Sequence, residues 1–247
     1  MSTVHSHPAL QRAYNGSTSS FDKHDRLRRL MGPRTPAELK RVDLIRFRLP
    51  AAALTMAAAL LVVSLFLPYW KITLFAPQYP HGLTVTAYVN RVGGQVAEVD
   101  ILNQYIGMKP LEAAAPMEKR FSLFLIAAMV LLVIAAVKIH SPLAAGLSLP
   151  ALLYPVVFLA DLQYWLADFG LHLDPHAPLN LAVKPFVPRV LGIGHIGQFK
   201  SVAVPCSGLI LAVIASILIL TGLWLQRRAY QPLRDGQTTK TPKGGPA

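Results

Sequence analysis

Four long apolar segments constrain this chain more than any other feature of its sequence. A helix needs about 17–25 mainly apolar residues to cross the hydrocarbon layer of a membrane. Segments of that length lie at 50–69, 121–137, 143–167 and 203–226. The composition agrees, because only 15% of the residues are charged, whereas about a quarter are charged in soluble domains. The sequence therefore predicts an α-helical integral membrane protein with four transmembrane helices.

The distribution of Lys and Arg predicts how the chain threads. Ten precede the first apolar segment, one lies in the turn 138–142, and five lie in the tail 227–247. The long connections 70–120 and 168–202 carry five and three. Because positive residues collect in cytoplasmic segments, we expect both termini in the cytoplasm and both long connections outside it. We expect a multi-pass protein of the bacterial cytoplasmic (inner) membrane.

The segments that precede and follow the spans are basic. A net charge of +12 would suggest nucleic acid in a soluble protein, but here it follows the membrane topology, so we expect no nucleic-acid partner. Residues 1–34 and 227–247 are predicted to be basic cytoplasmic tails, the first of them disordered. Residues 35–49 begin with a helix-capping pattern. They are predicted to form an interfacial amphipathic helix, or alternatively a docking helix for a cytoplasmic partner.

The first outer connection, 70–120, carries strand patterns. Apolar and polar residues alternate over 83–90 and again over 97–101, and Gly93-Gly94 lies between them. This pattern predicts a β-hairpin, to which residues 71–74 could add a third strand. Because an isolated hairpin is only marginally stable in water, we expect it to rest on the second outer connection or on a partner protein.

The second outer connection, 168–202, shows no long regular pattern. It contains three histidines and four prolines, and Pro175 makes a continuous helix between His172 and His176 unfavourable. We therefore predict an irregular outer loop that packs over the membrane surface.

Five residues of the two outer connections are candidate metal ligands: His81, Met108, His172, His176 and His195. Imidazole together with thioether suits copper, and the thioether favours Cu(I). Copper is therefore a possible cofactor. In the alternative interpretation the histidines are solvated loop residues and Met108 fills a gap among apolar side chains.

Two single residues in or near the spans also carry chemistry. Asp161 is the only ionisable residue well inside a predicted span, where such a group is a candidate for function. It is either an acid at the outer interface or part of a relay, which would need a second intramembrane partner. The single cysteine, Cys206, excludes an intrachain disulfide and a Cys-x-x-Cys pair. We expect a packing residue, with a further soft ligand as the alternative.

Three short motifs carry a resemblance to known proteins. The segments APQYPHGL (76–83), ILNQYIGM (101–108) and AVKPFVPRVLG (182–192) resemble a group of bacterial multi-pass membrane proteins associated with copper and nitrous-oxide-reductase accessory genes. Members of that group carry LNHYIGM, whereas Gln104 stands here in place of the histidine. The resemblance implies an accessory role in metal delivery or enzyme maturation on the outer face.

The motifs of common enzyme classes are missing from the sequence. It contains neither Gly-x-Ser-x-Gly nor His-Glu-x-x-His, and no phosphate-binding loop. We therefore expect a non-enzymatic membrane accessory protein that handles copper or supports maturation of an extracytoplasmic metalloenzyme. The alternatives are a structural or assembly subunit of a larger membrane complex and a transporter component. Expected partners are the lipid bilayer and a membrane or extracytoplasmic protein.

Overall fold

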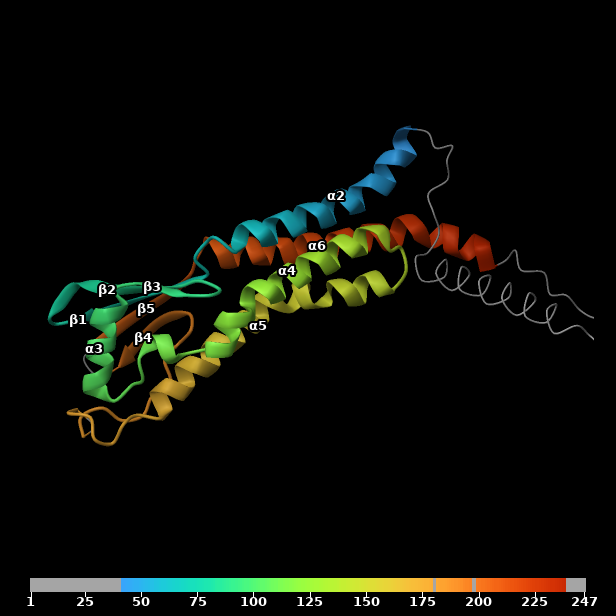
Figure 1. Ribbon diagram of the computed structural model, residues 1–247. Coiled ribbons are helices and arrows are strands. Elements are labelled where there is room, and N and C mark those ends of the chain that lie inside the picture. The colour runs from blue at the N-terminus through green and yellow to red at the C-terminus, as the bar shows by residue number, and fades with distance from the viewer. Residues whose placement is uncertain (1–40, 180, 197–198, 239–247) are drawn as a thin grey trace, which may run out of the picture.

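The computed structural model describes residues 41–179, 181–196 and 199–238, and in this part the chain forms a helical bundle with a β-sheet at one end (Figure 1). The predicted tail 1–34, residues 35–40 of the predicted interfacial helix and residues 239–247 of the predicted tail 227–247 lie outside the described residues. The helices are α2 (Arg41–Ser64), α3 (Val96–Ile106), α4 (Pro116–Lys138), α5 (Leu143–Leu171) and α6 (Ser207–Thr238), with a short 3-10 turn, η1 (Leu111–Ala113). The strands are β1 (Trp70–Ala76), β2 (Tyr79–Ala87), β3 (Val92–Gly94), β4 (Gly192–Ile196) and β5 (Phe199–Pro205).

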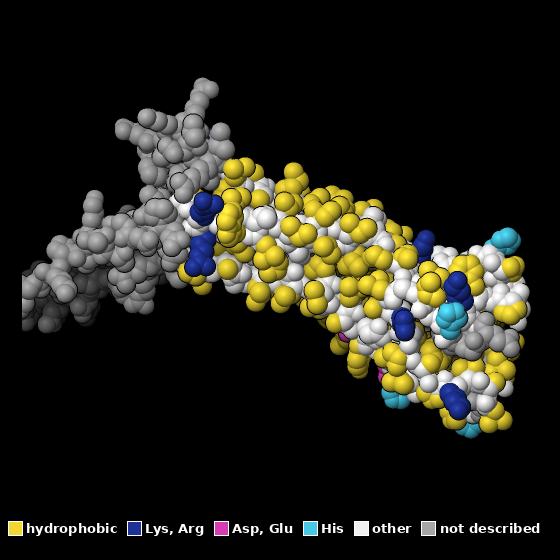
Figure 2. Space-filling model, turned by 180° about the vertical axis from the view of Figure 1, so that it is seen from behind, with side chains coloured by type: hydrophobic (Ala, Val, Ile, Leu, Met, Phe, Trp, Pro, Cys, Tyr) yellow, Lys and Arg dark blue, Asp and Glu magenta, His cyan; other side chains and the backbone are white. Residues whose placement is uncertain are grey.

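Three described helices are long and apolar enough to cross a membrane: α4, α5 and the part of α6 from Ser207 to Tyr230. Hydrophobic side chains cover most of the visible face of the bundle, and the Lys, Arg and His side chains gather toward its two ends (Figure 2). Such a surface is unfavourable in water and favourable in lipid. The structure thus agrees with the prediction of a helical membrane protein in that three described helices could cross a membrane by their length and composition.

The first predicted span differs from the expected one. Residues 41–64 form one helix that contains Pro50, so the predicted boundary between an interfacial helix and a span at residues 49–50 is not a break. The apolar helix Arg48–Ser64 is shorter than the other three. It ends before residue 69 because the chain turns over residues 62–67 and Trp70 already begins β1.

Small residues allow the bundle to close tightly. Ala57, Ala212 and Ala215 are fully buried, and a Cβ added at Gly222 would lie 3.0 Å from Leu54 Cγ. Small residues let membrane helices approach closely. The hydroxyl of Ser216 on α6 also donates to the Leu152 carbonyl of α5 at 3.1 Å, so neighbouring helices are joined by polar as well as apolar contacts.

The sheet is antiparallel and has the strand order β3-β2-β1-β5-β4. Strand β5 pairs with β1 from Trp70↔Pro205 to Phe75↔Lys200. The second outer connection is therefore not irregular throughout, which corrects the prediction for 168–202. It supplies β4 and most of β5, and these strands support β1 and β2 of the first connection.

The position of β5 also corrects the predicted start of the fourth span. The sequence predicts residues 203–205 as part of the span because they are apolar, but they belong to β5 and α6 begins at Ser207. Ala203 is apolar because it lies in the core under the sheet, where it is 2% exposed.

The predicted strand at 97–101 is wrong, because these residues lie in helix α3. Val99, Asn103 and Ile106 are buried, and their spacing is that of one helix face. Gly107 ends the helix with φ 85°, as expected for a left-handed C-terminal residue. Gly94 is likewise not in a turn but in β3, paired with Val85.

One core joins the sheet to the helices beneath it. Trp70, Ile72 and Val85 pack with Val99 of α3 and with the partly buried Leu166 of α5. Helix α5 continues past the end of the apolar helical bundle and runs alongside the sheet (Figure 1). The sheet is thus fixed to the bundle through α5 as well as through β1 and β5.

Candidate functional site

The predicted copper ligands do not converge. His81 lies on β2 and His195 on β4, and both are exposed. Strands β1 and β5 separate β2 from β4. Three strand spacings place the two imidazoles roughly 14 Å apart or more. Within the part of the chain that the structure describes, no three His, Cys, Asp or Glu side chains form a group that could hold a metal ion.

Met108 faces an apolar cavity rather than the histidines. The cavity has a volume of about 90 Å³ and lies between the sheet, α3 and α5, where Trp70, Leu166 and Phe186 also line it. A flexible thioether fills irregular apolar gaps well. The position therefore favours the interpretation of Met108 as a packing residue.

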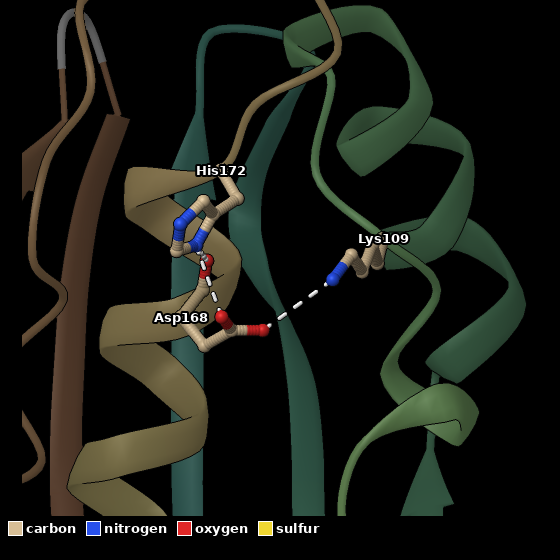
Figure 3. Close-up of polar contacts among 3 residues, drawn as sticks. All are labelled: Lys109, Asp168 and His172. Carbon is tan, nitrogen blue, oxygen red and sulfur yellow. Dashed lines mark hydrogen bonds and ion pairs between the residues drawn. The ribbon is translucent and has the colours of Figure 1, made fainter.

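A polar cluster joins the end of α5 to the segment after α3 (Figure 3). Asp168 Oδ1 lies 2.9 Å from His172 Nδ1, and Asp168 Oδ2 lies 3.4 Å from Lys109 Nζ. The side chain of Asp168 is 24% exposed, whereas those of Lys109 and His172 are 52% and 68% exposed. Exposed ion pairs of this kind stabilise a fold by at most about 1 kcal/mol. The contact with Asp168 orients the His172 ring through Nδ1, and the Nε2 atom takes no part in that contact.

The segment after α5 repeats this arrangement at a second histidine. Asp174 Oδ1 accepts the backbone N–H of His176 at 2.9 Å and lies 3.3 Å from His176 Nδ1. The backbone N–H of His176 lowers the pKa of the Asp174 carboxyl below its ordinary value of 3.8. Both imidazoles are therefore held through Nδ1 by an aspartate.

Two backbone hydrogen bonds fasten this segment to the end of α3. The N–H of Asp174 donates to the Gly107 carbonyl at 2.8 Å, and the N–H of Leu179 donates to the Tyr105 carbonyl at 3.0 Å. A Cβ added at Gly107 would lie 2.7 Å from the Asp174 nitrogen. The two outer connections therefore meet at a position that only glycine fits.

The two segments that these hydrogen bonds join carry four exposed apolar side chains. We call this set the junction surface; its residues are Ile101 (55% exposed), Tyr105 (51%), Leu179 (40%) and Leu181 (98%). The strand predicted over 97–101 does not reveal this surface, because it does not bring Ile101 and Tyr105 onto one helix face. The signal was the i, i+4 spacing of Ile101 and Tyr105, which lie on one face of a helix and off its buried face.

The remaining candidates lie nearer the bundle. Asp161 borders a cleft between α4 and α5, to which Glu118 also contributes. Cys206 is half-buried between β5 and α6, and burial raises the pKa of its thiol. A raised pKa disfavours the thiolate that binds metals, in keeping with a packing role.

Comparison of the whole chain with protein-family models and with curated proteins gives no match.

Proposed function

We propose that this chain is a non-enzymatic membrane protein that docks an extracytoplasmic protein partner onto the bacterial cytoplasmic membrane. In this proposal α2, α4, α5 and α6 all cross the membrane, both termini are cytoplasmic, and the sheet faces outward. The observation that carries the proposal is the junction surface, whose apolar residues lie on α3 and on the segment after α5. Exposed apolar patches of this kind mark interaction sites.

The attachment of the sheet to the spans supports a docking role. The N–H of Cys206 donates to the Tyr69 carbonyl at 2.9 Å, and the N–H of Gly208 donates to the Pro68 carbonyl at 2.8 Å. These bonds join the strand ends to each other where α2 ends and α6 begins. A preorganised surface loses less conformational entropy on binding than a flexible one. The arrangement therefore suits a protein that holds a partner at a set position above the membrane.

The charge distribution and helix lengths support four spans. The apolar part of α2 from Arg48 to Ser64 is 17 residues long and extends over about 26 Å, and a short span is accommodated by local thinning of the bilayer. Four spans return the chain to its starting side. The Lys and Arg residues of the tail 227–247 then lie on the same side as the ten that precede residue 50, as the positive-inside rule requires.

Site-specific photocrosslinking in native membranes tests the docking role. A photoreactive residue placed at Tyr105 or at Leu181 is expected to capture the same extracytoplasmic protein. The matched control is His81, which is also exposed but lies on β2 rather than on α3 or on the segment after α5. A Leu181→Asp substitution should abolish the crosslink from Tyr105. Capture at His81 equal to that at Tyr105, or an unchanged crosslink in Leu181→Asp, would contradict the proposal.

A copper-handling role is the second proposal, and the orientation of two histidines favours it. His172 and His176 are each held through Nδ1 by an aspartate, which is how metal-ligating histidines are commonly oriented. The resemblance of the loop motifs to copper-associated proteins points the same way. Cu(I) titration of the purified protein should show binding that a His172→Ala, His176→Ala variant loses. A His81→Ala, His195→Ala variant is the control, and equal loss in both variants would contradict this assignment.

A further inference from the structure

A cleft between α4 and α5 combines an apolar floor with a charged rim. It has a volume of about 270 Å³ and is covered by the connection between β2 and β3. Leu125, Met129 and Val157 line its apolar part, and Arg91, Glu118 and Asp161 line its polar part. The cleft therefore offers both kinds of surface that an amphiphile requires.

The two acidic residues lie at the same depth along the bundle. Asp161 follows the start of α5 by 18 residues and Glu118 precedes the end of α4 by 20, which correspond to about 27 and about 30 Å along the helix axes. The hydrocarbon layer is about 30 Å thick. Both carboxylates therefore stand where acyl chains give way to lipid headgroups.

The carboxylates of this rim have no cationic partner among the residues that the structure describes. Glu118 lies close enough to Asp161 for the two negative charges to repel, yet neither forms an ion pair with a described Lys, Arg or His. The Lys119 ammonium, which also lines the cleft, instead donates to the Glu112 carbonyl at 2.6 Å. Asp161 is half-buried and Glu118 is exposed in the first turn of α4, so a cation from outside this part of the chain can reach both carboxylates.

A buried hydroxyl provides an independent sign of a polar ligand. Tyr154 lines the same cleft and is 9% exposed. Its hydroxyl lies within reach of the Tyr69 hydroxyl, which is itself joined to Ser64 Oγ at 2.8 Å, but it makes no hydrogen bond of normal geometry with any described residue. An acceptor on the ligand, such as an ester carbonyl, would complete the hydrogen bonding of Tyr154.

We propose that this cleft is a binding site for an aminophospholipid with a primary ammonium headgroup, such as phosphatidylethanolamine. The ammonium group pairs with Asp161 and Glu118, and its three N–H donors match carboxylate acceptors. The guanidinium of Arg91, stacked 4.5 Å above the Tyr88 ring, is placed to meet the phosphate. An acyl chain lies along Leu125, Met129 and Val157.

Native mass spectrometry of the full-length protein in detergent tests this assignment. After delipidation, the protein is mixed with equal amounts of phosphatidylethanolamine, phosphatidylcholine and phosphatidylglycerol. We expect at least about tenfold tighter binding of phosphatidylethanolamine, equivalent to about 1.4 kcal/mol, and loss of that preference in Asp161→Asn, Glu118→Gln. The matched control, Glu98→Gln, Glu112→Gln, changes two exposed carboxylates outside the cleft and should keep the preference.

Three results would overturn the assignment. They are equal binding of the three lipids by the native protein, an unchanged preference in the cleft variant, and equal loss in the control variant. If the cleft variant does not fold, Val157→Trp replaces it, because Val157 is 58% exposed at the edge of the cleft and a larger side chain is accommodated there. Val157→Trp should reduce phosphatidylethanolamine binding, and unchanged binding would again overturn the proposal. None of these residues belongs to the junction surface, so the result is independent of the docking proposal.

Discussion

Replacing Gly107 by alanine should detach the second outer connection from α3. Gly107 has φ 85°, a conformation that costs a residue with a Cβ about 1–2 kcal/mol. The added Cβ would also lie 2.7 Å from the Asp174 nitrogen and 2.9 Å from the Asp174 oxygen. These atoms are backbone, so the contact is relieved only if the whole segment moves.

The cost of that movement follows from the bonds that it breaks. The segment is held to α3 by the hydrogen bonds Asp174 N–H to Gly107 O and Leu179 N–H to Tyr105 O. Two backbone hydrogen bonds contribute about 1–3 kcal/mol together, which is less than the cost of compressing backbone atoms to such distances. We therefore expect the segment to move, and the amides of Asp174 and Leu179 to lose about tenfold to hundredfold in hydrogen-exchange protection.

Hydrogen exchange of the full-length protein in detergent measures this loss. Gly192→Ala is the matched control, because Gly192 has φ 91° but an added Cβ there meets nothing within 4 Å. Gly192→Ala therefore has the conformational cost of alanine at a positive φ but lacks the close contact with backbone atoms. If Gly107→Ala left the two amides as protected as Gly192→Ala does, the argument from close contact would be refuted.

Three further predictions concern the polar groups near the junction. Asp168→Asn should lower the free energy of unfolding by no more than about 1 kcal/mol, because its contacts with Lys109 and His172 are exposed; a larger loss in thermal unfolding would show that the cluster is structurally essential. The lowered pKa of Asp174 stabilises the fold at pH values above the ordinary value of 3.8, and this contribution is lost as the pH falls below 3.8 through the folded-state pKa. The native protein should therefore lose more stability than Asp174→Asn between pH 5 and pH 3, and equal acid profiles would contradict this. Cys206, with a raised thiol pKa, should react with maleimide more slowly at pH 7.5 than a cysteine placed at exposed Leu181, and equal rates would contradict the burial argument.

The local pattern of apolar residues was sufficient to predict the helices of the bundle. The segments 121–137 and 143–167 lie within α4 and α5, because a membrane helix satisfies its own backbone and needs only an unbroken apolar run. The same reasoning fails at residues 203–205, because these apolar residues belong to the end of β5. Apolar character by itself does not distinguish a membrane helix from a strand that is buried in a core.

The short alternation of apolar and polar residues over 97–101 was insufficient to predict that this segment is helical. Residues 97–101 alternate over five positions, and over so short a stretch a period of 2 is not separable from a helical period. The helix becomes recognisable only when Asn103 and Ile106 are included, because they continue the face that begins at Val99. The misassignment also concealed the junction surface, since Ile101 and Tyr105 share a face only in a helix.

The sequence by itself determined the membrane class of the protein and the approximate positions of its apolar helices, because both depend on residues that are adjacent in the chain. Only the tertiary structure decided that β5 pairs with β1, that the two outer connections meet at Gly107, and that Glu118 and Asp161 line one cleft. It also decided that His81 and His195 lie on strands separated by two others. Each of these relations joins residues that are distant in sequence, and strand pairing and side-chain convergence leave no periodic signal in the chain.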